Sequence, residues 1–157
     1  MNIDHVDYQI LKILQSEGRI SNVELARQVG LAPSGVLERV RRLEKRGIIK
    51  GYEVRLNSTE LDFGLIAFMA IRTSEPVGVT DLGRELAQIP EIQEVHHLAG
   101  EDCYLIKLRV RDNAALAQLM RDQLSKFSAI TATRTTIVLE TIKETLQIPI
   151  SHTANDD

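Results

Sequence analysis

Two short helical patterns joined by a tight glycine turn are the feature that most limits the fold of this chain. The first begins at Ser21, whose side chain can cap a helix, and Glu24 three residues later completes a capping box. Gly30 ends this segment, and Pro33 suits the first turn of the next helix because its missing N–H group costs nothing there. Two helices linked so closely predict a helix-turn-helix unit over residues 21–46.

The segments on either side of this unit extend it to a domain over residues 1–52. Residues 4–17 predict a preceding helix that ends at Gly18. Its apolar residues recur at helical spacing on one face: Val6, Ile10, Ile13 and Leu14. After the unit, residues 47–52 predict a turn into a β-hairpin, the wing of a winged helix-turn-helix, with Lys50 at its tip.

The helix that starts at Pro33 is predicted to turn a basic face away from its buried stripe. The stripe is Val36, Val40, Leu43 and Glu44. Arginine can bond guanine through two N–H groups, and small residues let a helix approach the base edges. The residues expected to meet bases are Ser34, Gly35, Glu38, Arg42 and Arg39. Those expected to meet phosphates are Arg41, Lys45, Arg46 and Lys50. The alternative is a solvated charged face on an ordinary helix.

The charge of the chain is divided unevenly, although its formal net charge is −3. Residues 1–57 hold 10 Lys and Arg against 7 Asp and Glu, whereas residues 58–157 hold 9 against 15. A basic first part joined to an acidic remainder suggests that only the first part meets nucleic acid.

From residue 53 onward the periodicity changes from helical to mixed. Residues 53–57 alternate like a strand within a linker over residues 53–63. The strands expected beyond the linker are residues 65–72, 92–98, 104–110 and 130–142, and the helices are residues 81–88 and 113–127. The order βαββαβ predicts a ferredoxin-like domain over residues 64–144 and therefore an α+β fold. The tail, residues 145–157, is polar and expected to fray.

Three absences point to a cytoplasmic protein with no membrane partner. The single cysteine, Cys103, excludes an intrachain disulfide, which fits a reducing compartment. The N-terminus carries acids where a secretory signal needs basic residues. The chain also has no apolar window long enough for a membrane span.

A glycine and two acids between the second and third strands suggest a small-molecule site. Gly100 permits a tight turn whose N–H groups form a nest for a carboxylate. Glu101 or Asp102 is placed to accept a hydrogen bond from an ammonium group. Hydroxyl groups for the same ligand are available at Thr133, Thr135 and Thr136, either from the same chain or from a neighbouring subunit. The alternative is a plain β-turn with surface acids beside a threonine-rich edge strand.

Three stretches of the chain together resemble one family of regulators. They are DYQILKILQSEGRISNVELARQVGLAPSGVLERVRRLEKRGIIKGYEVRLN, AGEDCYLIKLRVRD and TATRTTIVLETIK. They are similar to the Lrp/AsnC, or feast/famine, regulators, and the match covers about residues 3–144. The resemblance implies a winged helix-turn-helix, a ligand-binding ferredoxin-like domain, dimers formed through that domain, frequent assembly to octamers that wrap DNA, and a response to amino acids.

Two departures from the family pattern affect the expected sites. Ala32 stands where many members have serine, so the helix cap there is weaker. Cys103 stands where many members have aspartate, which leaves Glu101 and Asp102 as the ammonium acceptors. The expected effector residues are therefore Gly100, Glu101, Asp102, Cys103, Tyr104, Thr133, Thr135 and Thr136.

The sequence favours a DNA-binding, ligand-responsive transcription regulator. Its expected partners are double-stranded DNA, an amino acid or related effector, and further copies of the chain. The alternative is an architectural DNA-wrapping protein without a working effector site. No enzyme, cofactor or metal is expected, because no nucleophile–base pair or phosphate loop is present. The adjacent His96 and His97 of a strand would also point to opposite faces.

Overall fold

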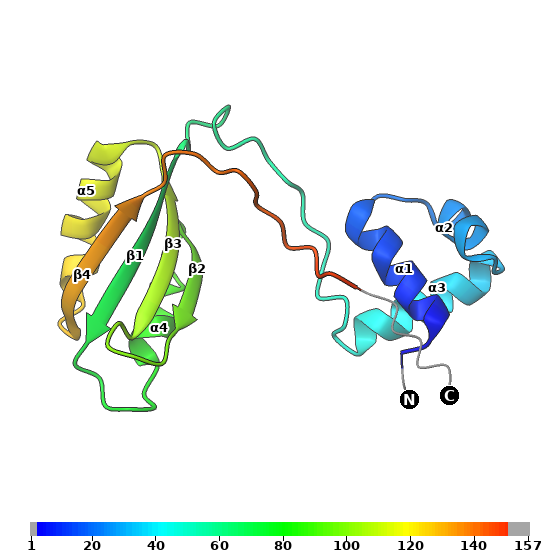
Figure 1. The fold of residues 1–157 in the computed structure, drawn as a ribbon, viewed down its shortest axis with the longest axis horizontal. Helices are drawn as coiled ribbons and strands as arrows, with labels where there is room; N and C mark the ends of the chain where they lie inside the picture. Colours follow the sequence, from blue (N-terminus) through cyan, green and yellow to red (C-terminus); the bar gives the residue numbers. More distant parts are fainter. Residues whose placement is uncertain (1–2, 151–157) are drawn as a thin grey trace. The chain divides into compact units, whose positions relative to one another are not determined.

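The chain forms two compact units in a computed structural model that describes residues 3–150 (Figure 1). The first unit contains the chain up to Arg55 together with the segment from Glu144 onward. The second contains Leu56–Lys143. Within the described residues no helix is long and apolar enough to cross a membrane.

The first unit is a bundle of three helices around a small aliphatic core. The helices are α1 (His5–Ser16), α2 (Asn22–Val29) and α3 (Pro33–Lys45). Their fully enclosed apolar side chains are Ile10, Leu25, Ala26, Val36 and Leu43. The predicted helix-turn-helix is confirmed, with α2 and α3 joined by three residues.

Local hydrogen bonds explain where these helices start and stop. Ser21 accepts a bond from the Glu24 N–H at 3.1 Å, but the Glu24 carboxylate binds Arg27 instead of returning the bond. Only half of the predicted capping box is therefore present. Gly30 ends α2 in the left-handed region at φ 71°, which glycine adopts without strain.

A complete capping box occurs instead at the start of α1. Asp4 accepts a hydrogen bond from the Asp7 N–H at 2.8 Å, and the Asp7 carboxylate accepts one from the Asp4 N–H at 3.4 Å. At the other end of α1 the cap is Glu17 and Gly18 follows it, as predicted, although Gly18 does not take the left-handed conformation of Gly30.

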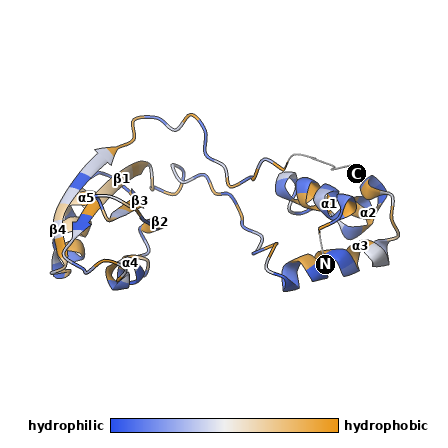
Figure 2. Cartoon of the chain, turned by 60° about the horizontal axis from the view of Figure 1, so that its bottom comes forward, coloured by the Kyte–Doolittle hydropathy of each residue, from blue (hydrophilic) through white to orange (hydrophobic). Residues whose placement is uncertain are grey.

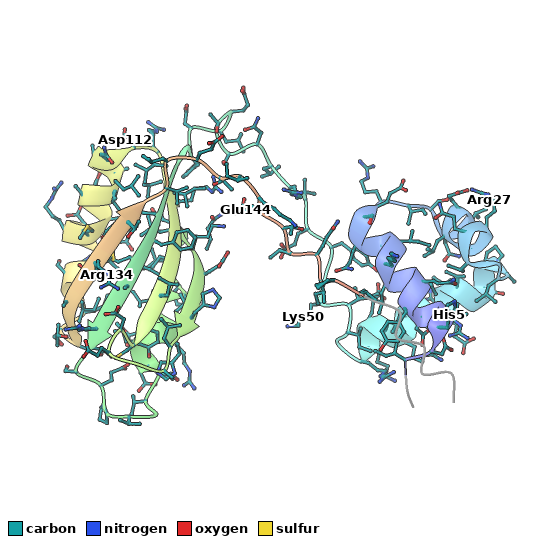
Figure 3. The ribbon with its side chains drawn as sticks, in the orientation of Figure 1. His5, Arg27, Lys50, Asp112, Arg134 and Glu144 are labelled. Atoms are coloured by element: carbon teal, nitrogen blue, oxygen red, sulfur yellow. The ribbon has the colours of Figure 1, made fainter. Side chains whose placement is uncertain are left out.

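The predicted wing after α3 is also wrong. Gly47 takes a left-handed conformation at φ 68° and directs the chain back toward the helix. The N–H groups of Ile48 and Ile49 then bond the Leu43 carbonyl, and both side chains pack on the core. The turn therefore closes α3, and no strand occurs over residues 47–64. Lys50 lies on extended chain rather than at a hairpin tip (Figure 3).

The second unit is an antiparallel four-stranded sheet with the order β2-β3-β1-β4. Its strands are β1 (Leu65–Thr73), β2 (Ile92–His97), β3 (Tyr104–Val110) and β4 (Ile130–Ile137). Its helices are α4 (Asp81–Leu86) and α5 (Asn113–Asp122), followed by a 3-10 turn at Leu124–Lys126. The predicted βαββαβ order and the α+β class are confirmed.

Both helices pack on one face of the sheet and enclose its core. Leu82 and Leu86 of α4 join Leu116 and Leu119 of α5 against inward side chains of the strands. The opposite face carries Phe68, which is partly exposed and follows the alternation of β1. No helix covers that face in the described chain (Figure 1).

Two C-terminal predictions need correction. The last strand was expected to reach residue 142 but ends at Ile137, which pairs with Ala67 near the start of β1; in this register residue 142 would lie opposite residue 62, before β1 begins. The tail was expected to fray, yet Gln15 of α1 bonds the Ile148 N–H at 2.6 Å. Residues 151–157 of that prediction lie outside the described residues.

Among the described glycines, Gly83 has the most closely packed neighbour, which is the Tyr104 ring. This ring lies under Gly83 of α4, where an added Cβ would come within 2.6 Å of a ring carbon. The Tyr104 hydroxyl group donates to Glu75 at 3.1 Å, and the same carboxylate accepts from the Leu82 N–H at 2.8 Å. One tyrosine thus fixes β3, the β1–α4 loop and the start of α4 together.

Gly83→Ala is expected to lower the free energy of unfolding by about 1–3 kcal/mol, because the new methyl group overlaps the Tyr104 ring. The result opposes helix propensity, which favours alanine by about 1 kcal/mol. Gly35→Ala in α3 is the matched control, since its Cβ would meet nothing within 4 Å. Urea denaturation followed by circular dichroism measures both; equal effects would contradict the packing.

Ala32→Ser is expected to stabilise the first unit by about 1 kcal/mol. Ala32 has φ −68° and ψ 146°, nearly the backbone of Ser21 at φ −69° and ψ 150°, and Ser21 caps its helix. A hydroxyl group at position 32 would therefore reach a free N–H of α3. The reciprocal Ser21→Ala should lose a similar amount, and a shift of the same sign in both variants would contradict this account.

Candidate nucleic-acid interface and effector loop

The start and outer side of α3 form an exposed polar surface. Asn22 of α2 donates to the Pro33 carbonyl at 2.8 Å, which ties the first turn of α3 to the preceding helix. The predicted DNA contacts that are exposed along the helix and just beyond it are Ser34, Glu38, Arg41, Lys45, Arg46 and Lys50. Gly35 is half-buried. In Figure 2 α3 is largely coloured as hydrophilic.

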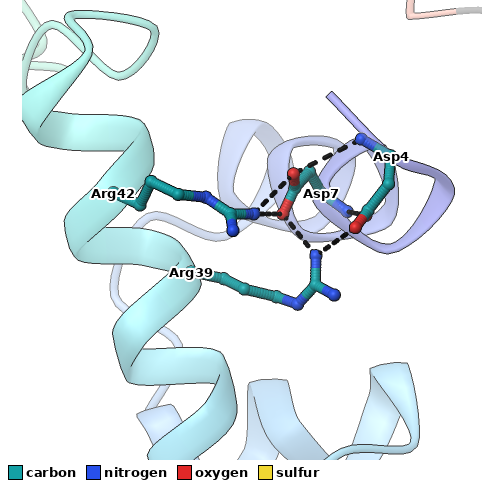
Figure 4. A network of polar contacts seen from close by, with 4 residues as sticks. All are labelled: Asp4, Asp7, Arg39 and Arg42. Atoms are coloured by element: carbon teal, nitrogen blue, oxygen red, sulfur yellow. Dashed lines mark hydrogen bonds and ion pairs between the residues drawn. The ribbon is translucent and has the colours of Figure 1, made fainter. Parts of the chain in front are cut away.

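Arg39 and Arg42 do not share this outward direction. They reach across to α1 and bind Asp7, whose side chain is 0% exposed (Figure 4). Arg42 donates from Nη2 to both Asp7 oxygens, at 2.9 and 2.8 Å, and Arg39 donates from Nη1 to Asp7 at 2.8 Å. The same Nη1 also binds Asp4 at 2.5 Å. We call these four side chains the α1–α3 ion network.

The network is electrically balanced, with two carboxylates facing two guanidinium groups. The hydrogen bonds that Arg39 donates to Asp4 and Asp7 raise the pKa of Arg39 above its ordinary value. Partial burial pushes the pKa of Asp4 upward, but bonds from Arg39 and the Asp7 N–H outweigh this, so the pKa of Asp4 is lowered. A buried carboxylate such as Asp7 persists in a fold only when it is paired in this way.

The predicted outward face of α3 is therefore rotated in the structure. Arg42 was placed outward and Glu44 in the buried stripe, yet Arg42 is partly buried and Glu44 is exposed. Glu44 accepts a hydrogen bond from the Tyr52 hydroxyl at 3.0 Å, and burial together with that bond raises the pKa of Tyr52 to about 12. The cause is α1, whose buried Asp7 attracts the side of the helix that carries Arg42.

Sequence reasoning missed two residues of this region. Asp7 was counted only among the acids that argue against a secretory signal, although its spacing of three from Asp4 matches a capping box. Leu37 was assigned to neither face, and it is 39% exposed beside Glu38 and Arg41. An apolar side chain there can contact the methyl group of thymine.

The loop between β2 and β3 has its acids already paired. Gly100 takes φ 139°, a conformation that favours glycine. Glu101 accepts from Arg72 at 2.7 Å, and Asp102 accepts from Arg134 at 2.7 Å with Arg72 3.5 Å away. Figure 3 labels Arg134 on β4. An incoming ammonium group would have to share these carboxylates with two arginines.

The last two residues of the predicted effector loop differ in exposure. Cys103 is a half-buried free thiol whose sulfur lies 3.8 Å from the Glu101 carbonyl. Tyr104 is 1% exposed, with its hydroxyl group bound to Glu75. Its side chain therefore belongs to the core, and a ligand at the loop would meet its backbone rather than its ring.

The three threonines of β4 do not converge. Thr133 and Thr135 pair with Ile71 and Met69, which face the helices, whereas Thr136 pairs with Phe68 on the opposite face. Alternation along a strand sends their hydroxyl groups to two sides of the sheet. The expectation that all three bind one ligand within a single chain is therefore wrong.

A cavity of about 310 Å³ lies elsewhere in the second unit. It is lined by Phe63, Glu91, Val110, Arg111, Ala115, Gln118, Leu119, Asp122 and Gln123. It contains none of the predicted effector residues and lies at the Val110 end of β3, away from Tyr104. Among the residues the structure describes, no group of three His, Cys, Asp or Glu side chains is placed to hold a metal ion.

Comparisons with known families divide the chain in the same order as the two units. Residues 3–50 match the family described as winged helix-turn-helix DNA-binding, and residues 66–148 match the Lrp/AsnC ligand binding domain. The leucine-responsive regulatory protein of Escherichia coli is 40% identical over 151 residues, which cover 95% of this chain and 92% of that protein.

Solved structures of transcriptional regulators also match this chain. A transcriptional regulator of Neisseria meningitidis in complex with L-methionine matches with a TM-score of 0.87 and 31% identity, covering 94% of this chain and 97% of that one. The feast or famine regulatory protein of M. tuberculosis, also with L-methionine, matches with a TM-score of 0.86 and 34% identity, covering 94% and 99%. The chain therefore belongs to the Lrp/AsnC family of transcriptional regulators.

Proposed function

We propose that this protein binds double-stranded DNA sequence-specifically through α3 and that an amino acid modulates the binding. The observation that carries the proposal is the exposed side of α3, which begins with small residues and continues into basic ones. Small residues at a helix start allow close approach to base edges, and the outer cations neutralise phosphates. Such a protein acts where the DNA is, so we also propose a cytoplasmic location and no catalytic activity.

The contacts divide into two groups by chemistry. The proposed base-edge contacts are Ser34, Gly35, Leu37 and Glu38, and the proposed phosphate contacts are Arg41, Lys45, Arg46 and Lys50. Glu38 can accept from the amino group of cytosine, and Leu37 suits a thymine methyl group. One helix reads only a short half-site, so pairs of chains are needed for selectivity.

We propose that the chain forms a homodimer through the second unit and that dimers assemble further, to an octamer. The sheet face with Phe68 supports this, because the helices cover only the opposite face of the sheet and leave this one open to a second copy. Two copies of α3 would then meet two half-sites of one DNA duplex. The second unit thus supplies the symmetry that the DNA-binding unit lacks.

The DNA proposal predicts tight and selective binding to DNA upstream of this gene or its neighbours. We expect the affinity for the preferred fragment to exceed that for scrambled DNA by on the order of 1000-fold at physiological salt. Glu38→Ala should reduce the preference for that fragment, whereas Lys45→Gln should weaken binding to both fragments equally. Lys12→Gln, an exposed charge on α1, is the control. Equal affinity for upstream and scrambled DNA in fluorescence anisotropy would refute specific regulation.

The effector is proposed to bind at the loop Gly100–Tyr104, with Asp102 accepting from its ammonium group. L-methionine is the first amino acid to test, because two similar proteins were solved with it. A bound effector at 100 times its Kd should stabilise the protein by about 2.7 kcal/mol. Differential scanning fluorimetry with each of the twenty amino acids measures this as a rise in Tm. Asp102→Asn should abolish the rise, and Asp122→Asn, in the separate cavity, should keep it.

An architectural DNA-wrapping protein is the second candidate. The observation that favours it is the pairing of Glu101 and Asp102 with Arg72 and Arg134, with which an ammonium group would have to compete in this loop. If none of the twenty amino acids shifts Tm while DNA binding and assembly persist, this candidate replaces the effector proposal. If the Tm shift persists in Asp102→Asn and is lost in Asp122→Asn, the effector binds in the cavity and not at the loop.

A further inference from the structure

The hydrogen bonds of Arg42 leave it poorly equipped to read a base. A guanidinium group offers two edges with paired donors, Nη1–Nη2 and Nε–Nη2, and a bidentate contact to guanine needs one of them. Nη2 belongs to both edges, and it donates to both oxygens of Asp7 at 2.9 and 2.8 Å. Nε is buried without a hydrogen-bond partner. Nη1 of Arg42 carries none of these bonds, so a paired contact through either edge would have to share Nη2 with Asp7.

We propose that Asp7 is a positioning residue for the DNA-binding helix, which holds Arg42 away from the bases and fixes α3 against α1. The inference deepens the proposed function and rests on it, since it decides which side of α3 faces DNA. Asp7 touches no DNA in this account. It acts through Arg42 and, by a second bond, through Arg39.

Burial makes the attachment hard to exchange. The Asp7 side chain is fully enclosed, so an arginine that leaves it costs the carboxylate a partner that it needs in a buried position. A phosphate or guanine that captured Arg42 would leave the carboxylate with Arg39 alone, and Arg39 is already shared with Asp4. Arg39 differs from Arg42 in one respect, because its Nε–Nη2 edge carries none of these bonds.

The attachment of Arg42 to Asp7 determines which side of α3 can face DNA. With Arg42 held on α1, the surface available to DNA is centred on Glu38, Arg41 and Lys45. Releasing Arg42 would add a cation near the groove that attracts any phosphate, whatever the sequence. The proposal therefore assigns to Asp7 an effect on specificity, in addition to its effect on folding.

The salt dependence of DNA binding tests this directly, with neighbouring arginines as a matched pair. In the full chain, Arg41→Gln should reduce the slope of log K against log salt by about 0.9, the value of one phosphate contact. Arg42→Gln should leave the slope unchanged. Asp7→Asn should make binding to scrambled DNA tighter and its slope steeper by about 0.9 for the released arginine. If Arg42→Gln lowers the slope as much as Arg41→Gln does, Arg42 is a phosphate contact and the proposal is wrong.

Hydrogen exchange of the α3 amides tests the attachment without DNA, so it decides this inference even if the proposed DNA binding fails. Asp7→Asn should lower the protection of α3 on the order of 10- to 100-fold. In a double-mutant cycle, Asp7→Asn and Arg42→Gln should show a coupling of about tenfold, whereas Asp7→Asn and Arg41→Gln should combine within about twofold. If Asp7→Asn does not fold, the slopes of Arg41→Gln and Arg42→Gln still decide. Equal coupling in the two cycles would overturn the proposal.

Discussion

The enclosed carboxylate of Asp7 is the contact on which the DNA-binding unit depends. It joins the first and third helices, together with the Arg39–Asp4 ion pair and the aliphatic core. Removing one partner of a buried ion pair costs about 3–5 kcal/mol, whereas a good bidentate base contact contributes about 1–3 kcal/mol. Because the first cost exceeds the second, we expect Arg42 to stay on Asp7 when the protein binds DNA. This cost is a large fraction of the free energy of unfolding of a domain, which is about 5–15 kcal/mol.

The same comparison explains why arginine content alone is a poor guide to a DNA interface. Arg41 and Arg42 are neighbours in the sequence, and a helical wheel treats both as candidates. The wheel considers one helix, while the direction of Arg42 is set by a carboxylate 35 residues earlier in the chain. Asp7 resembled an ordinary acid of a first helical turn, and nothing in its local sequence reveals that α3 will enclose it. Its burial is a tertiary property.

The larger architecture could be predicted from the sequence because hydrophobic periodicity and the residues that begin and end helices depend only on neighbouring positions. The three helices, the four strands in their order, the cap at Ser21 and the left-handed Gly30 all follow from short patterns. The wing failed because Gly47 serves the end of α3, and the packing of Ile48 and Ile49 outweighed a hairpin. The last strand was overextended since its length depends on β1, which begins about 70 residues earlier. Pairing of Glu101 and Asp102 with arginines of β1 and β4 likewise requires the folded sheet.

In the second unit, residues that were predicted to bind an effector also stabilise the fold. Tyr104 was grouped with the effector loop, yet its ring completes the core beneath Gly83 and its hydroxyl group engages Glu75. The loop beside it carries acids that arginines of β1 and β4 already neutralise. On the proposed function, an effector at this loop would exchange these ion pairs for its own contacts with the carboxylates.

A crystal structure of the full chain bound to its selected DNA fragment would show which partner Arg42 keeps. We expect Arg42 Nη2 to remain on Asp7 with no base within hydrogen-bond distance of Arg42, while Arg41 and Lys45 approach phosphates. A guanine held by both terminal nitrogens of Arg42, with Asp7 left to Arg39 alone, would contradict this expectation.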